Sequence, residues 1–302
     1  MNVSIIWLAK NNVNKCITEA SIISSFNIVL LNVSLFILDR QNSNTHSPKV
    51  FIANDLFYFY KSSYTDSIFS DFCDVINFSN ANYILPVPDD DPIEYKQLLK
   101  MLENFGRRKN PDKAIYIPVP SKPLDISSKI NYGTLESNST YTFWQYMHNR
   151  TTNIAFYSLL SSNHTLKAYS MLNKLTFEKY WLNPLWDQFF VWLLSYTDLH
   201  PNIHCIDEFY LHYNNANWSD KTSIKETRLS YRSSINNIEA SLIYLFLSIR
   251  IKIRLIEYMR WSFYLLKKSI IYYNSRLLLE LFFKLIRLNF INLFRNPDET
   301  YS

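Results

Sequence analysis

The stretch ASIISSFNIVLLNVSLFIL, residues 20–38, holds 19 consecutive residues without a charged side chain. Its length matches the roughly 17–25 residues that a membrane-spanning helix needs. Its β-branched residues suit buried strands equally well. Polar side chains, each costly to place in lipid, interrupt it, among them Ser24, Ser25, Asn27, Asn32 and Ser34. We therefore favour a buried strand or a core helix for this stretch, with a membrane span as the alternative.

The chain around this stretch has very little glycine, with only Gly106 and Gly133 among 302 residues. Backbone loops that wrap phosphate groups need several glycines at short spacing. The count therefore excludes the dinucleotide-binding, P-loop, protein-kinase and nucleophile-elbow motifs. Aromatic residues make up 17% of the chain. This composition is typical of a very AT-rich genome, such as that of an organelle.

Residues 80–139 are divided by prolines, which break long helices and strands. We interpret this segment as a boundary region that contains one short helix over Asp91–Phe105, ended by Gly106. The acidic run Asp89–Asp91 is best explained as the start of that helix, because carboxylates stabilise a helix N-terminus. A divalent-cation site is the alternative for the run, but no second oxygen-rich cluster accompanies it.

After residue 141 hydrophobic side chains recur at helical spacing. Helices are expected over residues 143–160, 165–175 and 184–196, and the first two are joined by a short turn at residues 161–164. Two helices joined so closely pack antiparallel. The run therefore predicts a helix-turn-helix followed by a further core helix.

The segment SLIYLFLSIRIKIRL, residues 241–255, changes to a period of two. Apolar residues alternate there with Arg250, Lys252 and Arg254, so one face of the predicted strand is cationic. Residues 229–233 can pair with this strand through a turn at Asn236 and Asn237. We expect a β-hairpin over about residues 228–254, with helices over residues 255–294.

The net charge of +5 is unevenly distributed along the chain. Residues 1–139 hold 13 Lys and Arg against 14 Asp and Glu, whereas residues 221–302 hold 14 against 6. A cationic block of this kind suits a polyanion, either nucleic acid or an anionic membrane surface. A solvated helix face is the alternative interpretation.

No constellation in the sequence predicts an enzyme, a cofactor or a metal. No nucleophile, base and carboxylate stand in a recognisable frame. The three cysteines are too few and too far apart for a disulfide framework, which fits a reducing compartment. Four residues resemble a zinc set superficially but lack paired ligand spacing, so we expect partly buried structural histidines: His200, His204, Cys205 and His212.

The C-terminal half resembles small-subunit ribosomal protein seven, the rRNA-binding protein of the ribosomal head. The run SIRIKIRLIEYMRW, residues 248–261, is similar to the family's basic strand and its Met-Arg-Trp triplet. Arg276 and Glu280, each followed by leucine, are similar to the next helix, and residues 156–175 to the first helix-turn-helix. The glycines that the family uses at its hairpin tip and first turn are missing here.

The resemblance implies a mainly α fold, with a helical bundle and a protruding β-hairpin over residues 140–302. Residues 1–139 would be a mixed, proline-punctuated and lineage-specific N-terminal extension. The implied function is that of a structural, non-enzymatic component of a mitochondrial ribosome in the matrix, organelle-encoded and bound to the 3′ major domain near the tRNA exit site. Its partners would be small-subunit rRNA, neighbouring head proteins, exit-site tRNA and mRNA. The alternative is a structural subunit of a mitochondrial inner-membrane respiratory complex.

The charge pattern and the resemblance together select eight cations as contacts to rRNA phosphates. They lie on the predicted hairpin and at the start of the helix that follows it, where cations suit a phosphate backbone. These residues are Arg228, Arg232, Arg250, Lys252, Arg254, Arg260, Lys267 and Lys268.

Overall fold

The fold was obtained as a computed structural model, which divides the chain into two compact units. The first unit comprises Met1–Asn173 with Asp187–Asn217, and the second comprises Lys174–Trp186 with Trp218–Ser302. The architecture below is that of the first unit. The structure describes residues 2–9, 12–26, 32–41, 49–63, 68–89, 92–108, 111–119, 135–149, 157–174, 190–191, 193–194, 202–207 and 260.

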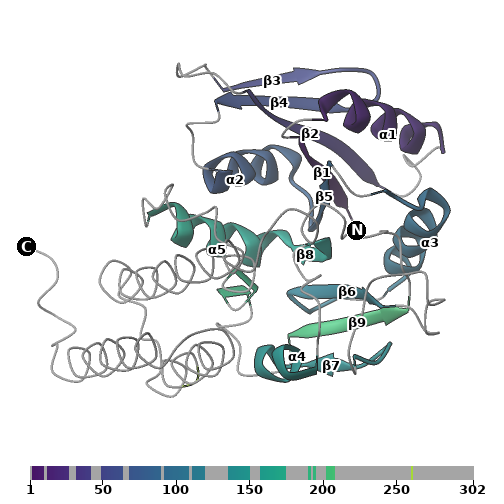
Figure 1. Ribbon diagram of the computed structural model, residues 1–302, viewed down its shortest axis with the longest axis vertical. Helices are drawn as coiled ribbons and strands as arrows, with labels where there is room; N and C mark the ends of the chain where they lie inside the picture. Colours follow the sequence, from purple (N-terminus) through teal and green to yellow (C-terminus); the bar gives the residue numbers. More distant parts are fainter. Residues whose placement is uncertain are drawn as a thin grey trace, which may run out of the picture. The chain divides into compact units, whose positions relative to one another are not determined.

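The described residues form a nine-stranded sheet in the order β3-β4-β2-β1-β5-β8-β6-β9-β7 (Figure 1). Its strands are β1 (Val3–Ala9), β2 (Val33–Gln41), β3 (Val50–Ala53), β4 (Tyr58–Ser63), β5 (Tyr83–Pro88), β6 (Ile115–Val119), β7 (Thr140–Tyr141), β8 (Leu159–Ser161) and β9 (Ile203–Asp207). Its helices are α1 (Val13–Ser25), α2 (Ile68–Ser79), α3 (Tyr95–Gly106), α4 (Phe143–Asn149) and α5 (Ser162–Lys174).

Most of the sheet is parallel. Strand β1 pairs in parallel with β2 on one side and with β5 on the other, and β4 and β9 also join parallel neighbours. Only β3, β7 and β8 run against the rest. The chain builds outward from β1 through β2 to β4 and then returns to place β5 on the other side of β1. The winding direction therefore reverses between β1 and β5, which is the topological switch point of an open α/β sheet.

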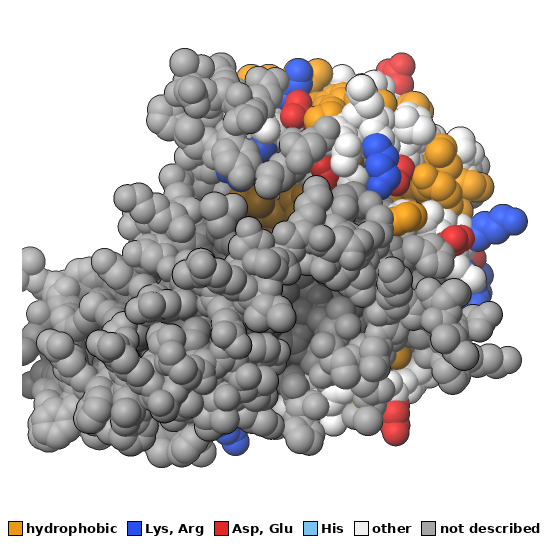
Figure 2. All heavy atoms as spheres, in the orientation of Figure 1, with side chains coloured by type: hydrophobic (Ala, Val, Ile, Leu, Met, Phe, Trp, Pro, Cys, Tyr) orange, Lys and Arg blue, Asp and Glu red, His pale blue; other side chains and the backbone are white. Residues whose placement is uncertain are grey.

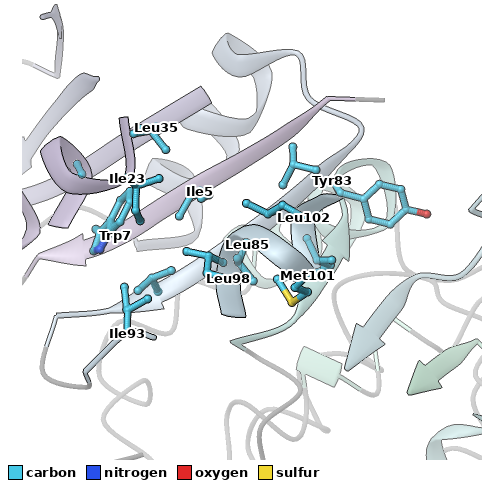
Figure 3. Packing of buried hydrophobic residues seen from close by; sticks show 14 of the residues in the cluster. Ile5, Trp7, Ile23, Leu35, Tyr83, Leu85, Ile93, Leu98, Met101 and Leu102 are labelled. Atoms are coloured by element: carbon cyan, nitrogen blue, oxygen red, sulfur yellow. The ribbon is translucent and has the colours of Figure 1, made fainter. Parts of the chain in front are cut away.

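Helices cover both faces of the sheet. Helices α1 and α3 pack on the face that holds the odd-numbered residues of β1, β2 and β5, such as Trp7 and Leu85 (Figure 3). On the opposite face, the ring of Phe36 lies 6.2 Å from that of Phe78 in α2. Tyr169 of α5 stacks there on Phe72 of α2 at 4.9 Å. Because β1 and β5 are covered on both sides, they carry the continuous apolar runs VSIIWLA and YILPVP.

Within residues 20–38, the described residues include the end of α1 and the first part of β2. The favoured interpretation, a buried helix or strand, is confirmed. Within the described ranges, no helix is both long and apolar enough to cross a membrane.

Asparagine replaces glycine at left-handed positions of the chain. Among the described non-glycine residues, positive φ angles occur only at Asn32 (52°), Asn80 (49°) and Asn138 (62°). Asparagine tolerates this conformation better than other residues with a side chain. At the end of α2, Asn80 N donates to Ile76 O at 3.2 Å, which closes the helix in the way a glycine cap usually does.

Prolines do not interrupt β5 and β6, because their missing N–H groups fall beyond the end of β8. Tyr83 N donates to Asn2 O on the β1 side, so Pro86 and Pro88 turn their backbone groups toward the β8 side. On that side β8 pairs only with the first two residues of β5. Pro118 likewise lies beyond the two residues of β6 that pair with β8. The segment interpreted as a boundary region therefore supplies two inner strands.

The prediction of a mainly α bundle is wrong, because the described part of the chain is built on a large sheet. The first expected helix, over residues 143–160, forms helix α4 at its start and strand β8 at its end, and the second expected helix forms α5, which begins where the turn was expected. Leu159 and Leu160 are fully buried between β5 and β6, and this packing overrides their helical spacing. The expected hairpin over residues 228–254 lies outside the described residues.

The edge strand β3 carries an apolar surface. Val50 and Ile52 are 41% exposed, and Leu56 in the turn to β4 is 49% exposed. Figure 2 shows hydrophobic side chains on the surface in this part of the molecule. Strand β3 is separated from β1 by β4 and β2, so this apolar surface lies away from the switch point.

Candidate functional site

The carboxyl ends of the parallel strands meet along one edge of the sheet. In open α/β sheets, ligands bind outside these ends at the switch point, which here lies between β1 and β5. Ala9 ends β1, and Asp39 of β2 lies opposite it. Leu8 lies opposite Pro88, the last residue of β5, so Asp89 follows level with Ala9 on its other side. Two carboxylates therefore flank the end of the central strand.

The small Ala9 side chain separates these two acidic residues. With the usual spacing between strands, the backbones of Asp39 and Asp89 lie about 10 Å apart. Both residues are half-buried, whereas Ala9 is only 2% exposed. Asp39 and Asp89 therefore lie on either side of a small side chain at the carboxyl ends of the strands.

The first turn of α1 holds the loop that follows β5. The backbone N–H of Asn12 donates to Asp89 Oδ2 at 3.2 Å, and Asn12 Nδ2 donates to Asp89 O at 3.4 Å. Lys15 Nζ donates to the same carbonyl at 3.1 Å. Asp89 is therefore oriented through both its side chain and its backbone.

A buried carboxylate lies behind Lys15. Glu19 Oε1 is 3.6 Å from Lys15 Nζ, and Glu19 Oε2 accepts a hydrogen bond from Trp7 Nε1 at 2.9 Å. Glu19 is only 4% exposed, and Trp7 is fully buried. Burial raises the pKa of Glu19, while the hydrogen bond from Trp7 and the charge of Lys15 oppose the shift.

Asp39 is also in a partly desolvated position. Burial raises the pKa of Asp39, and the charge of Lys61, its neighbour across the β2–β4 ladder, opposes the shift. Carboxylates with raised pKa values at a ligand-binding edge are typical of functional sites.

The acidic run does not start helix α3. That helix begins at Tyr95 with Glu94 as its N-cap residue, so the N-cap interpretation of Asp89–Asp91 is wrong. The expected helix over residues 91–105 exists, but it begins later than predicted. Asp90 and Asp91 lie outside the described residues, and within the described ranges no group of three or more metal-ligating side chains occurs.

The carboxylate of Asp89 and the two acids that follow it in sequence supply hard oxygen donors. Such donors suit Mg²⁺ and Mn²⁺, which prefer carboxylates together with substrate phosphates. The donor chemistry of Asp89–Asp91 therefore fits a divalent cation at the strand end.

The sequence-selected cations are not brought together by the described residues. Arg260 lies in a helical turn and is exposed, and the other seven lie outside the described residues, so their role as phosphate contacts stays a prediction. Sequence reasoning missed Asn12, Lys15 and Glu19, and it gave Asp39 no role. The available signal was an acid directly after an apolar run, in SLFILD and in YILPVPD.

The superficial zinc set is separated by strand geometry. His204 and Cys205 are consecutive residues of β9, so their side chains point to opposite faces. His204 Nδ1 lies 2.9 Å from Thr140 Oγ1, and its Nε2 lies 3.4 Å from a guanidinium nitrogen of Arg108. Because arginine can only donate, Nε2 is the acceptor and the ring is neutral. His200 and His212 lie outside the described residues.

We expect His204 to make the fold less stable in mild acid. Burial and the charges of Arg108 and Lys113 lower the pKa of His204 below its ordinary 6.5. As pH falls below about 6.5, the unfolded chain takes up the proton first, so stability is lost. The urea midpoint should fall between about pH 7.5 and about pH 5.5, and less so in His204→Gln. An equal fall in that variant would show that His204 does not carry the effect.

No protein-family model and no curated protein sequence matches the chain. The chain is similar to two solved structures of S. aureus TarS residues 1–349, one of them in complex with UDP-GlcNAc. Their TM-scores are 0.47 and 0.48, at 12% identity over 97% of this chain and 90% of each of those. A structure of S. aureus TarS has a TM-score of 0.42 at 12% identity, over 100% of this chain and 55% of that one.

The assignment to the ribosomal protein family is wrong, together with the rRNA-binding function and the ribosomal partners that it implied. The described residues from 140 onward contribute β7, β8 and β9 to the large sheet beside helices α4 and α5, so they do not form the helical bundle that the resemblance implied. The prediction of no enzyme falls as well, because carboxylates stand at the ligand-binding edge. The extension over residues 1–139 and the mitochondrial location stay predictions.

Proposed function

We propose that the chain is a sugar-nucleotide-dependent glycosyltransferase whose donor site lies at the carboxyl ends of β1, β2 and β5. The observation that carries the proposal is the position of Asp89 at the switch point, where the sequence continues with Asp90 and Asp91. Nucleotides are the ligands most often bound at this place in open α/β sheets.

The scarcity of glycine supports a particular way of binding phosphate. A dinucleotide fold holds the pyrophosphate on a glycine-rich turn, and this chain has only Gly106 and Gly133. An acidic run cannot accept a diphosphate directly, because both are anionic. Asp89–Asp91 would hold a divalent cation, and that cation would supply the positive charge that neutralises the diphosphate.

Asp39 has the position of a nucleoside-binding residue. It ends β2 beside the switch point, where acidic side chains of nucleotide-binding folds accept hydrogen bonds from a ribose hydroxyl. A base N–H offers the same kind of donor. Asp39 therefore selects a nucleoside, and Asp89–Asp91 serve the diphosphate.

Binding of the nucleoside by Asp39 and of the diphosphate at Asp89–Asp91 suits transfer of a sugar. An acceptor hydroxyl attacks the anomeric carbon, the bond from that carbon to the diphosphate oxygen breaks, and the nucleoside diphosphate leaves with the electron pair. The acceptor proton passes to a base or to water. Asp89–Asp91 would contribute to this reaction by holding a divalent cation, whose positive charge would stabilise the negative charge that develops on the leaving group.

The proposal predicts that the protein binds a nucleoside diphosphate sugar only when Mn²⁺ or Mg²⁺ is present. UDP-GlcNAc, the ligand of one similar structure, is the first probe, with UDP, ADP and NAD compared by calorimetry. Asp39→Asn should weaken binding about 10-fold, because one charge-assisted hydrogen bond is lost.

Asp112→Asn is the matched control, because Asp112 is an exposed carboxylate that precedes β6 at the opposite edge of the sheet. It should bind like the wild type. Failure of the wild type to bind any nucleoside diphosphate or its sugar, with or without the cation, would refute the proposed function.

A further inference from the structure

We infer that Lys15 and Glu19 form a clamp that sets the orientation of Asp89, the first residue of the acidic run. The inference rests on the proposed function, and it concerns the residues behind the site. The clamp is a chain of contacts from the core to the loop after β5: Trp7 donates to Glu19, Glu19 pairs with Lys15, and Lys15 donates to the carbonyl of Asp89. Lys15 and Glu19 are positioning residues.

The clamp acts on the peptide group that leads into the run. Lys15 Nζ lies 3.1 Å from Asp89 O, the carbonyl of the peptide bond to Asp90. The backbone N–H of Asn12 also holds Asp89, because it donates to the side-chain oxygen Oδ2 of Asp89 at 3.2 Å. With both contacts made, rotation of the loop is opposed at two atoms of Asp89.

Glu19 gives the clamp its rigid anchor. Lys15 alone has a long flexible side chain that is 35% exposed, and such a side chain holds no single geometry by itself. The carboxylate of Glu19 is 5% exposed and is held by Trp7 Nε1 at 2.9 Å. Trp7 in turn packs with Ile23, Leu85 and the other core residues of this face (Figure 3).

Stability alone does not account for a buried carboxylate at this place. Burying an ion pair costs desolvation energy that its attraction only partly returns, and apolar replacements are often as stable. The surrounding residues of α1 and α3 are apolar, with Ala20, Ile23 and Leu98 fully buried. The charge of Glu19 therefore contributes geometry at the loop. Groups that orient metal-binding carboxylates typically change metal affinity by about 10–100-fold.

The test compares Lys15→Met with the wild type in the full-length chain. The affinity for Mn²⁺ alone and for UDP with Mn²⁺ should fall about 10-fold in Lys15→Met. Lys15→Arg, which keeps a donor and the charge, should recover most of that affinity. Hydrogen exchange of the backbone amides in residues 85–93 should be faster in Lys15→Met without any ligand. The midpoint of thermal unfolding should fall, because Glu19 is left buried without its cation, so binding and exchange are measured well below that midpoint.

Two variants serve as matched controls. Lys100→Met removes an exposed lysine of α3, and Glu103→Gln removes a glutamate of α3 that is 49% exposed. Glu19→Gln is a second test variant, and it should lower the affinity for Mn²⁺ about as much as Lys15→Met does. Glu103→Gln is its control. Both controls should match the wild type in affinity and in hydrogen exchange.

The outcomes separate the clamp from the proposed function. Wild-type affinity in Lys15→Met would overturn the clamp while the donor site stands. If the wild type binds neither Mn²⁺ nor UDP, the proposed function fails. Hydrogen exchange then decides on the clamp: faster exchange of residues 85–93 in Lys15→Met supports it, and unchanged exchange overturns it.

Discussion

Replacement of Asp71 by asparagine is expected to lower the free energy of unfolding by about 3 kcal/mol. The Asp71 side chain is fully buried at the start of α2. Its Oδ2 lies 3.2 Å from Arg40 Nε and accepts from Ser62 Oγ at 2.7 Å, and its Oδ1 lies 3.1 Å from Lys49 Nζ. Asparagine keeps the shape but removes the charge that compensates these two cations.

The measurement for Asp71 is the midpoint of thermal unfolding. A loss of this size corresponds to a fall of about 6–12 °C for a unit of this length. Asp112→Asn is the control, because the Asp112 side chain is 71% exposed and forms an ion pair with Lys113. An exposed pair contributes less than about 1 kcal/mol. An Asp71→Asn midpoint equal to that of Asp112→Asn would show that the buried cluster adds no stability.

Asp89→Asn should abolish sugar transfer without unfolding the protein. The substitution removes the first carboxylate of the acidic run and keeps an oxygen that can accept from the backbone N–H of Asn12. We expect the rate of UDP-GlcNAc hydrolysis or transfer to fall at least about 100-fold, because charge stabilisation of the leaving group is lost. The release of UDP, followed in the presence of Mn²⁺, is the measurement.

The unfolding temperature of Asp89→Asn shows whether a loss of activity comes from the site or from unfolding of the protein. Asp89 is half-buried at a strand end, so the variant should unfold at the temperature of the wild type. Asp112→Asn should retain full activity. If Asp89→Asn keeps the wild-type rate, the cation does not bind at the end of β5.

The sequence predicts the parts of the fold whose burial leaves a local signal. Residues 20–38 combine length, apolarity and interspersed polar groups, and this favours the buried helix and strand that are found. The helix over 91–105 follows from its spacing and the glycine at its end. Four residues of the expected core helix over 184–196 are helical and buried: Phe190, Val191, Leu193 and Leu194.

Strand β8 shows why the fold class was missed. Leu159 and Leu160 continue a helical spacing, yet they pair with Ile84 of β5 and Ile115 of β6. Those partners lie far away in the sequence, and such tertiary pairing overrides local propensity. The prolines of β5 and β6 misled in the same way. A proline destabilises a strand only where its missing N–H would have bonded to a neighbouring strand. The sequence of one segment does not show which strand lies beside it.

The site was missed because strand order creates it. Asp39 and Asp89 are separated by 50 positions in the sequence, and they meet on either side of Ala9 only because β1 lies between β2 and β5. Each acid alone looks like a common helix start or a surface charge. An acid directly after a buried apolar run was the local signal, and it gains meaning once the parallel order of the strands is known.

The location of the bound cation tests the central claim most directly. In protein labelled with ¹⁵N-alanine, Mn²⁺ with UDP should broaden the amide signal of Ala9, which lies between Asp39 and Asp89. Ala81 precedes β5 at the opposite edge of the sheet, roughly 25 Å from Asp89 along an extended strand, and its signal should stay sharp. Ala9→Ser assigns the signal. Broadening of Ala81 with a sharp Ala9, or no broadening at all, would contradict a nucleotide site at the switch point.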